Sequence, residues 1–384
     1  MSEQRIIEQI RALEKELSKT KYNKRTEHAI GLLKVKIARL KEQLEARREA
    51  KRGSKGPSYA VRKSGDATVA LIGLPSVGKS TLINRLTNAN SKTASYNFTT
   101  LECIPGLLEY KQAKIQILDL PGILGGAAEG TGRGKEAISV LRNADLILLV
   151  VEAYDVQRQL ETVRKELYNA GIRLNQHSPD VKIEKKERGG INITATVKLS
   201  NLTREDVAST LKEFKIMNAD VIIKEDISLG QFIDAVAGNR KYSEGLIVVN
   251  KIDMVGEEEI KSIKEYIESL SKKSAILKNC KEPKAVFISA ENNTNLEELK
   301  EAIYQRLDFI RVYLKEVGKD PDLEKPMILR RGATIRDACL KIHTDFPNRL
   351  RFARVWGPSA KFPGQKFKLE HQLSDTDILQ LHLK

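Results

Sequence analysis

A glycine-rich loop at residues 73–80, with the sequence GLPSVGKS, constrains the fold of this chain more than any other feature. The apolar run at residues 69–72 predicts a strand directly before the loop, and a helix is expected after it, over residues 79–87. In this setting a loop of the form G-x4-G-K-[ST] turns backbone N–H groups and a helix N-terminus toward phosphate oxygens. The loop therefore predicts a phosphate-binding site on an α/β scaffold, and a chance match is the less favoured interpretation.

Two later motifs predict the rest of a nucleotide pocket. DLPG at 119–122 follows the apolar run 115–118, and NKID at 250–253 follows the run 246–249. The carboxyl ends of parallel strands lie at one edge of a sheet, where α/β proteins bind their ligands. The Asp253 carboxylate can accept hydrogen bonds from guanine N1–H and the 2-amino group, whereas adenine would leave it unpaired. The motifs therefore predict GTP rather than ATP.

The candidate GTP-binding residues come from these motifs and from a Ser-Ala pair that follows the strand expected at 285–288. The backbone N–H groups of that pair are expected to face the guanine oxygen. The candidate residues are Gly73, Pro75, Ser76, Val77, Gly78, Lys79, Ser80, Thr81, Asp119, Gly122, Asn250, Lys251, Asp253, Ser289 and Ala290.

Phosphate and metal chemistry is assigned to a smaller set of side chains. Lys79 is expected to reach the β- and γ-phosphates, and the Ser80 hydroxyl to bind Mg²⁺. Asp119 is expected to hold the same ion through water, while the Gly122 N–H approaches the γ-phosphate. Thr100, the second of two adjacent threonines, is the predicted switch residue that meets Mg²⁺ when γ-phosphate is present; a threonine pair in an edge strand is the alternative. The predicted metal ligands are Ser80, Thr100 and Asp119, and the predicted catalytic residues are Lys79, Thr100 and Gly122.

The order of apolar runs predicts an α/β fold with several modules. About 95 residues separate two strands of the nucleotide domain, and a parallel crossover needs only about a dozen, so an inserted α+β domain is expected. A helix over 296–313 is expected to close the nucleotide domain. The expected modules are a helical hairpin over 1–46, a basic linker over 47–65, a P-loop GTPase domain over 66–170 and 241–314, the inserted domain over 171–240 and a small mixed sheet over 325–384.

Positive charge is concentrated at the two ends of the chain. Residues 1–65 hold 18 Lys and Arg against 8 Asp and Glu, and residues 325–384 hold 12 against 5. The remainder, 66–324, holds 36 against 38, so a nearly neutral body carries two basic appendages. This distribution favours a polyanionic partner, with solvated helix faces as the alternative.

The remaining composition points to the cytoplasm. No apolar run approaches the ~18 residues that a membrane helix needs, and the charged N-terminus lacks the apolar centre of a signal peptide. The three cysteines, Cys103, Cys280 and Cys339, are far apart and without metal-ligand spacing. Reduced thiols in an intracellular protein are the expected state.

The run DLPGILGGAAEGTGRGKE, preceded by NFTTLECIPG and a helical N-terminus, closely resembles the developmentally regulated GTP-binding proteins, in the Obg branch of the translation-factor-related GTPases. The stretch GQKFKLEHQLSDTDILQLHLK resembles a TGS domain, a β-grasp module. The resemblance covers essentially the whole chain. It implies that residues 171–240 are similar to the second domain of ribosomal protein S5. It also implies work near ribosomes or RNA and a dedicated stabilising partner protein.

One residue departs from small signalling GTPases. Those enzymes place a water-orienting glutamine after DxxG, whereas this chain has Ile123, a hydrophobic position shared with the family that it resembles. The candidates for that role are backbone groups of the loop at 125–134, a monovalent cation such as K⁺ near Ser76, or a partner. Some relatives that use potassium carry Asn where this chain has Ser76. Arg133 is a candidate charge-stabilising residue, with a surface role as the alternative.

These features together predict a GTP-binding and GTP-hydrolysing switch that acts on ribosomes or RNA in translation and is slow without a partner. The alternative is a signalling or cytoskeleton-associated GTPase whose basic appendages bind acidic protein surfaces. A nucleotide-regulated scaffold with negligible turnover is the third hypothesis. Sedimentation with ribosomes at increasing salt separates the first two, and turnover of the purified protein tests the third.

The guanine assignment makes a direct prediction about base choice. Asp253→Asn replaces an acceptor with a donor at the guanine N1 and N2 positions, so the variant should lose GTP affinity and gain xanthine nucleotide affinity. Titration of both nucleotides against the parent and the variant measures the exchange. An Asp253→Asn protein that binds GTP as tightly as the parent would contradict the assignment.

Overall fold

The structure is a computed structural model in which the chain separates into two compact units, each formed by segments distant in sequence. The described helices include none with the length and apolar composition needed to cross a membrane. The first unit comprises Met1–Tyr59, Gly171–Tyr242 and Ser271–Glu282, and the second comprises Ala60–Ala170, Ser243–Leu270 and Pro283–Lys384. The residues that the structure describes are 3–21, 27–52, 65–87, 105–120, 132–275 and 285–383.

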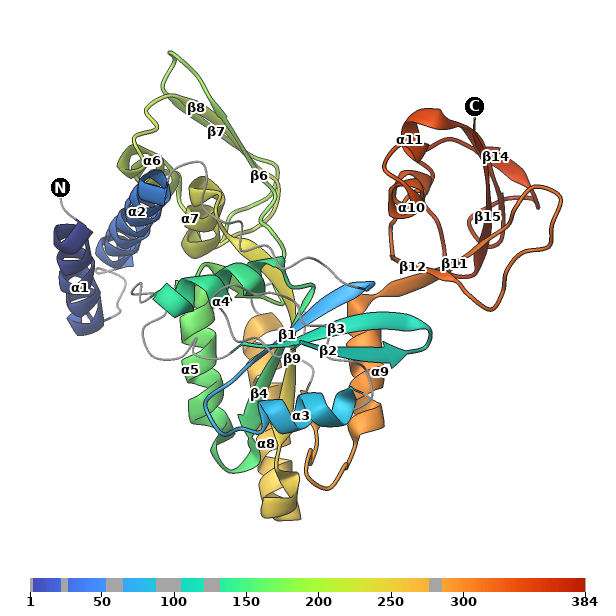
Figure 1. Cartoon of the computed structure of the whole chain (residues 1–384). Coiled ribbons are helices and arrows are strands. Elements are labelled where there is room, and N and C mark those ends of the chain that lie inside the picture. The colour runs from blue at the N-terminus through green and yellow to red at the C-terminus, as the bar shows by residue number, and fades with distance from the viewer. Residues whose placement is uncertain are drawn as a thin grey trace. The chain divides into compact units, whose positions relative to one another are not determined.

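A mostly parallel sheet forms the centre of the second unit (Figure 1). Its main order is β10-β9-β4-β1-β3-β2, with a seventh strand, β5 (Ile172–Leu174), paired with β9; along the main order the pairs are parallel except that of β2 with β3. All residues of β1 and β4 are buried, as expected for strands covered on both faces. The strands are β1 (Ala67–Ile72), β2 (Pro105–Tyr110), β3 (Ala113–Asp119), β4 (Leu146–Glu152), β9 (Lys241–Asn250) and β10 (Ala285–Phe287).

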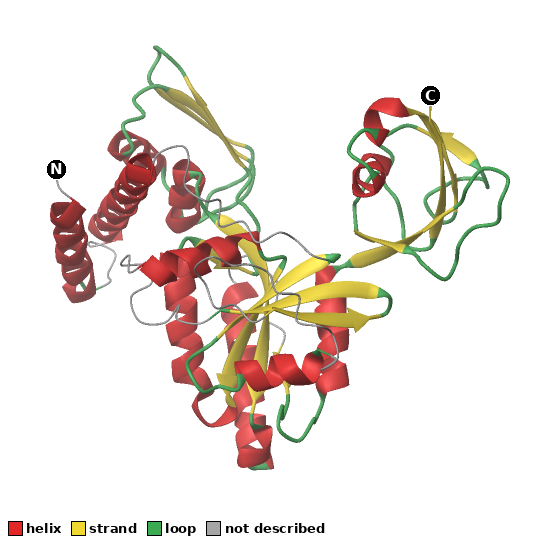
Figure 2. Ribbon diagram, viewed as in Figure 1, coloured by secondary structure: helices red, strands yellow, loops and turns green. Residues whose placement is uncertain are grey.

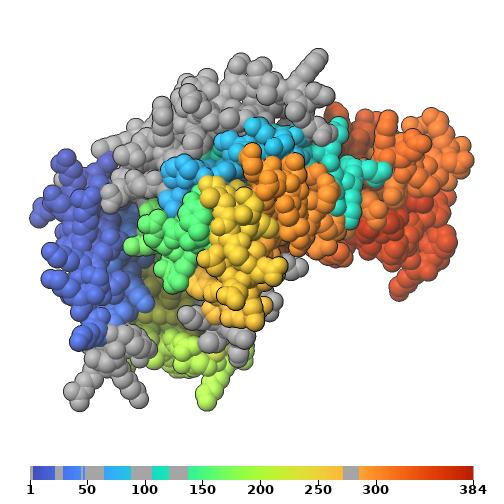
Figure 3. All heavy atoms as spheres, turned by 90° about the horizontal axis from the view of Figure 1, so that it is seen from below, coloured from blue at the N-terminus to red at the C-terminus, as the bar shows by residue number. Residues whose placement is uncertain are grey.

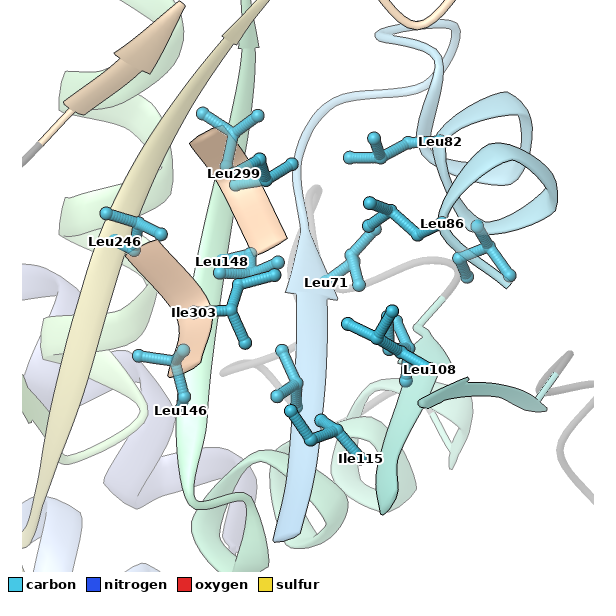
Figure 4. Close-up of a cluster of buried hydrophobic side chains, with 14 of the residues drawn as sticks. Leu71, Leu82, Leu86, Leu108, Ile115, Leu146, Leu148, Leu246, Leu299 and Ile303 are labelled. Carbon is cyan, nitrogen blue, oxygen red and sulfur yellow. The ribbon is translucent and has the colours of Figure 1, made fainter. Parts of the chain in front are cut away.

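Helices cover both faces of this sheet (Figure 2). One face packs leucines of β1, β4 and β9 against Leu82 and Leu86 of α3 (Lys79–Leu86) and against α9 (Leu296–Leu307), as Figure 4 shows. Because side chains alternate along a strand, the intervening residues face the other side, where α5 (Val156–Asn169) packs on β4. The other helices of the nucleotide domain are α4 (Gly132–Asn143), η2 (Ala153–Asp155), η3 (Ile252–Met254) and α8 (Glu257–Ala275); α8 and α9 form much of the surface in Figure 3.

Two N-terminal helices belong to the first unit. The apolar stripes of α1 (Glu3–Lys19) and α2 (Glu27–Arg52) meet in one cluster that includes Ile6, Ile10 and Ile37. The helix α2 runs to Arg52, beyond the limit of 46 expected for the hairpin and into the expected linker. The run EARREAKR consists of residues with high helix propensity, which explains the extension.

Gly171–Tyr242, the segment that follows α5, forms a further part of the first unit. Its three-stranded sheet has the order β6-β8-β7, and α6 and α7 cover one face of it through Val207, Leu211 and Phe232. The helix α2 packs against both of these helices, and Arg39 forms an ion pair with Glu213 at 2.8 Å. Likeness to ribosomal protein S5 stays a prediction. The elements are β5 (Ile172–Leu174), β6 (Val181–Lys185), β7 (Ile191–Ala195), α6 (Arg204–Glu213), β8 (Ala219–Ile223) and α7 (Leu229–Ala237).

The C-terminal residues form a five-stranded sheet of order β12-β11-β15-β13-β14. Its core joins Ile335, Ala338 and Cys339 of α10 to inward residues of the strands. Figure 1 shows α10 and α11 on the same side of this sheet. The elements are β11 (Phe309–Leu314), β12 (Met327–Arg330), α10 (Ile335–Ile342), α11 (Phe346–Arg349), β13 (Leu350–Trp356), β14 (Gln365–Phe367) and β15 (Asp377–Leu383).

The helix expected over 296–313 is wrong in its second half. The helix α9 ends at Leu307, Asp308 adopts a left-handed conformation with φ 49°, and the next residues form β11. The run FIRVYL is rich in β-branched and aromatic residues, which favours a strand. Phe309 remains in the core of the nucleotide domain, while Ile310 and Val312 enter the C-terminal core. The C-terminal sheet therefore begins at β11 rather than at residue 325.

Packing in the first unit predicts the effect of one core substitution. Phe232 has 0% of its surface exposed, so Phe232→Ala should lower the free energy of unfolding of that unit by about 3–5 kcal/mol. Urea denaturation followed by hydrogen exchange of amides in β6, β7 and β8 measures the loss. Met217→Ala is the control, because Met217 is 59% exposed and its truncation should cost less than about 0.5 kcal/mol. Equal effects of the two substitutions would contradict the described core.

Candidate nucleotide-binding site

The loop after β1 is shaped by close backbone contacts. A Cβ atom at Gly73 would lie 2.2 Å from the carbonyl oxygen of Val150 in β4, so only glycine allows this approach. Gly78 has φ +87° and precedes α3 as its N-cap, and a Cβ atom there would lie 2.5 Å from Nδ2 of Asn250. The first turn of α3 contains no acidic residue, so the positive end of its dipole is free to attract an anion.

Lys79 lies across this loop. Its ammonium donates hydrogen bonds to the carbonyl oxygens of Gly73 at 3.0 Å and Leu74 at 2.9 Å. Burial lowers the pKa of Lys79, and the charge of Asp119 opposes that shift. The ammonium is thus held beside backbone atoms of the loop, which suits it to phosphate oxygens bound there.

Two oxygen-bearing side chains meet where the loop joins α3. The Ser80 hydroxyl donates to Oδ2 of Asp119 at 2.9 Å, and Asp119 comes from the end of β3, next to Leu71 of β1. Among the residues that the structure describes, the second oxygen, Oδ1 of Asp119, is buried without a hydrogen-bond partner. A hydroxyl and a carboxylate with a spare oxygen are hard donors that fit Mg²⁺, which takes one or two protein ligands together with nucleotide phosphates. The pair therefore fits the ion that P-loop GTPases use with their nucleotide.

Asn250 ties three motifs together. Its Nδ2 donates to the carbonyl of Val77 in the loop at 2.9 Å, and its Oδ1 accepts from the N–H of Ala290 at 3.0 Å. Asn250 is 2% exposed, so both bonds are shielded from water. Asn250 therefore holds the phosphate loop and the segment after β10 in place. The sequence motif alone did not show whether Asn250 has this positioning role or contacts the nucleotide directly.

The Ser-Ala pair also differs from its expected use. The N–H of Ser289 donates to Thr294 at 3.3 Å, and the N–H of Ala290 donates to Asn250. Both N–H groups that were expected to face the guanine oxygen are thus engaged within the protein. The structural reason is that Asn250, on the adjacent strand, needs a donor for its own carbonyl oxygen. A guanine contact from this segment stays a prediction.

Lys251 has a partner that sequence reasoning missed. Its ammonium donates to the carbonyl of Ser76 at 2.9 Å and forms an ion pair with Glu152, the last residue of β4. Glu152 lies opposite Asn250 in the pairing of β4 with β9 and also accepts from Nε2 of Gln159 at 2.9 Å. The only feature of the sequence that could have indicated this ion pair is Glu152 itself, an acidic residue at the end of an otherwise apolar strand.

The ionisation of this pair is set by its contacts. Burial raises the pKa of Glu152, but hydrogen bonds from Lys251, Tyr154 and Gln159 outweigh that effect and hold the pKa below its ordinary value. The hydrogen bond to Glu152 in turn raises the pKa of Lys251. Both groups are therefore charged at neutral pH, and the ion pair holds the Lys251 ammonium against the loop.

The remaining predicted residues lie around this centre. Val77 is fully buried and anchors the loop, while Pro75 and Ser76 are exposed at its tip and Thr81 is half-buried in α3. Asp253 is exposed in η3, two residues after Lys251, so its carboxylate is accessible to a base. Its contact with guanine stays a prediction.

Several predicted site residues have no described position or side chain in the structure. Thr100, Gly122 and Ile123 lie outside the described residues, so their predicted roles stay predictions. Arg133 lies in α4, but its side chain is not described.

Comparison with known proteins agrees with this geometry. Residues 68–185 match the family model described as 50S ribosome-binding GTPase, 188–309 match the C-terminal region of that domain, and 310–383 match the TGS domain. The chain is 52% identical over 379 residues to a GTP-binding protein of Methanocaldococcus jannaschii, covering 99% of this chain and 93% of that protein. It is 42% identical over 377 residues to developmentally-regulated GTP-binding protein 2 of Homo sapiens, covering 98% and 99%.

A solved structure of the Schizosaccharomyces pombe YchF GTPase is also similar, with a TM-score of 0.43 and 15% identity over 84% of this chain and 99% of that chain. The nucleotide loop, its magnesium-type ligands and the matched family model define a P-loop GTPase, an enzyme that binds GTP and hydrolyses it. The chain belongs to the family of developmentally regulated GTP-binding proteins. The expected fold class, GTPase activity and TGS domain are confirmed.

The ion pair at Lys251 makes a prediction. Glu152→Gln removes the charge that holds this ammonium against the Ser76 carbonyl, so affinities for GTP and GDP should both fall about tenfold, or ~1.4 kcal/mol. Isothermal titration calorimetry with each nucleotide measures the change. Glu258→Gln, at an exposed position in α8, is the control and should bind as the parent does. Parent-like affinity in Glu152→Gln would show that Lys251 does not depend on this partner.

Proposed function

We propose that this GTPase is a switch that acts on ribosomes or other RNA in translation, in the cytoplasm. The observation that carries the proposal is the charge distribution, with basic excess in residues 1–65 and 325–384 and a nearly neutral body between them. A polyanion is the partner that such appendages attract, through neutralised phosphates and released counterions. The description of the matched family model, 50S ribosome-binding GTPase, supports the same partner.

The nucleotide site supports a switch with two states, one with the γ-phosphate bound and one without it. Lys79 and the N-terminus of α3 would hold the phosphates, and Ser80 with Asp119 would hold Mg²⁺. Thr100 and Gly122 are the groups proposed to sense the γ-phosphate and to change position when it leaves. Asn250 and Lys251 join the phosphate loop to the segment that carries Asp253, so base and phosphate recognition share one scaffold.

Hydrolysis is proposed to be slow in the isolated protein. An isoleucine side chain at 123 has no group that can orient the attacking water. The missing function would come from backbone groups of the loop at 125–134, from K⁺ near Ser76, or from a partner protein that binds and stabilises this chain. Such a partner would act as a stimulating factor as well as a stabiliser.

Charge neutralisation tests the proposed function without removing structural elements. Truncation would also remove core contacts, because α2 packs against α6 and α7 and β11 pairs with β12 and β15. Three matched double variants to glutamine are therefore compared. They are Lys15 with Lys19 in α1, Arg351 with Lys368 in the TGS domain, and Lys165 with Lys261 in the body, all exposed.

We expect all three variants to keep the parent's GTP affinity, because the nucleotide motifs lie within residues 73–290. In sedimentation with ribosomes at increasing salt, each terminal pair should reduce the slope of log affinity against log salt by about 1–2. The body pair should leave that slope unchanged. If all three pairs behave as the parent does, the basic termini are not the contact surface, and the inserted domain at 171–240 becomes the leading candidate.

A further inference from the structure

The C-terminal sheet has one face that its own helices do not cover. Along β13, Ala353 and Val355 point into the core with Leu379, so the alternating residues Phe352, Arg354 and Trp356 point to the opposite face. The helix α10 packs on the core side. We call this opposite side the open face and define it by Phe352, Arg354, Trp356, Lys366 and His382.

Aromatic rings lie on the open face with cations beside them. The rings of Phe352 and His382 are stacked, with centroids 4.4 Å apart and an interplanar angle of 21°. Nζ of Lys366 lies 4.9 Å from the Phe352 centroid, and Nζ of Lys315 lies 5.3 Å from the Trp356 ring. The three rings are half-buried, so each keeps part of its surface accessible to solvent.

The positive charges of the open face are close together and uncompensated. Arg354 lies directly opposite Lys366 in the pairing of β13 with β14, an arrangement of like charges that costs stability. Among the residues that the structure describes, no carboxylate forms an ion pair with Arg354, Lys366 or Arg351. Nε of Arg354 is also buried, with no hydrogen-bond partner among these described residues.

The pKa of His382 reflects the positive electrostatic potential at the open face. Burial lowers its pKa, and the positive charges of Arg354, Lys366 and Arg351 lower it further. Its Nε2 lies 3.0 Å from Oε1 of Gln380. The ring is therefore neutral at pH 7, which leaves it available for stacking while the surrounding cations attract an anion.

We propose that the open face of the TGS domain binds single-stranded RNA. Exposed bases would stack on Phe352, His382 and Trp356, and Lys366, Arg354 and Lys315 would meet the phosphates. Stacking surfaces joined to a basic track are how proteins bind unpaired strands, whereas a duplex hides the faces of its bases. The choice of RNA as the partner rests on the proposed function. The location of the binding site and its preference for a single strand rest on the residues of the open face alone.

The test uses the full chain with Mg²⁺ and GDP and measures fluorescence anisotropy of a labelled 12-nucleotide oligouridine and of an RNA duplex of equal length. Phe352→Leu removes a stacking ring but keeps an apolar side chain, so it should weaken single-strand binding at least about fivefold. Lys366→Gln should reduce the salt slope by about 0.7. The parent should prefer the single strand.

Two matched controls lie away from the open face. Tyr168→Leu changes a ring that is 55% exposed in α5 of the nucleotide domain, and Arg336→Gln neutralises an exposed cation on α10. Both should bind the single strand as the parent does. Losses in the controls equal to those in Phe352→Leu and Lys366→Gln would overturn the assignment to this face.

The outcomes separate this inference from the proposed function. If the parent sediments with ribosomes but binds single strand and duplex equally, with no loss in Phe352→Leu, the open face is not a single-strand site and the proposed function stands. If the parent binds neither RNA nor ribosomes at low salt, both are overturned. Binding of an acidic peptide that is lost in Phe352→Leu, without binding of RNA, would assign the face to a protein partner instead.

Discussion

The contact between Gly73 and the backbone of Val150 is the constraint on which the nucleotide site depends. The loop leaves β1 so close to β4 that no side chain fits between them. This places the loop over the carboxyl ends of the buried strands, where β3 supplies Asp119 and β9 supplies Asn250. A fully apolar, close-packed sheet holds these ends in place, because interiors at such density do not yield to small displacements.

Around that contact, most polar groups of the site form hydrogen bonds or ion pairs with one another. Asn250 joins the phosphate loop to the segment after β10, and Glu152 holds the Lys251 ammonium that also reaches the loop. Such networks are strong in a shielded environment only when each member has a partner. Asp119 departs from this rule, since one of its oxygens is buried beside the Ser80 hydroxyl with no hydrogen-bond partner in the described part of the chain. That exception coincides with the position where a GTPase holds its magnesium ion.

The C-terminal sheet shows how a strand can serve two modules. Phe309, at the start of β11, packs into the core of the nucleotide domain, and the following residues pack into the TGS core. The strand also pairs with β12 and β15 on its two sides. The TGS domain is thus attached through a structural strand rather than a free linker, and its uncovered basic and aromatic face remains available to a partner.

The sequence by itself determined the nucleotide loop, the parallel strands around it and the GTPase class, because G-x4-G-K-[ST], DLPG and NKID each carry local chemistry at fixed offsets from apolar runs. The charge of the two ends was also readable directly. Only the tertiary structure decided that Glu152 is the partner of Lys251, that Ala290 serves Asn250, and that α9 stops at Leu307 so that β11 can form. The two polar contacts depend on strand register and join residues 99 and 40 positions apart, which no local pattern specifies. For β11, local propensity favours a strand, but the pairing with β12 and β15 decides it.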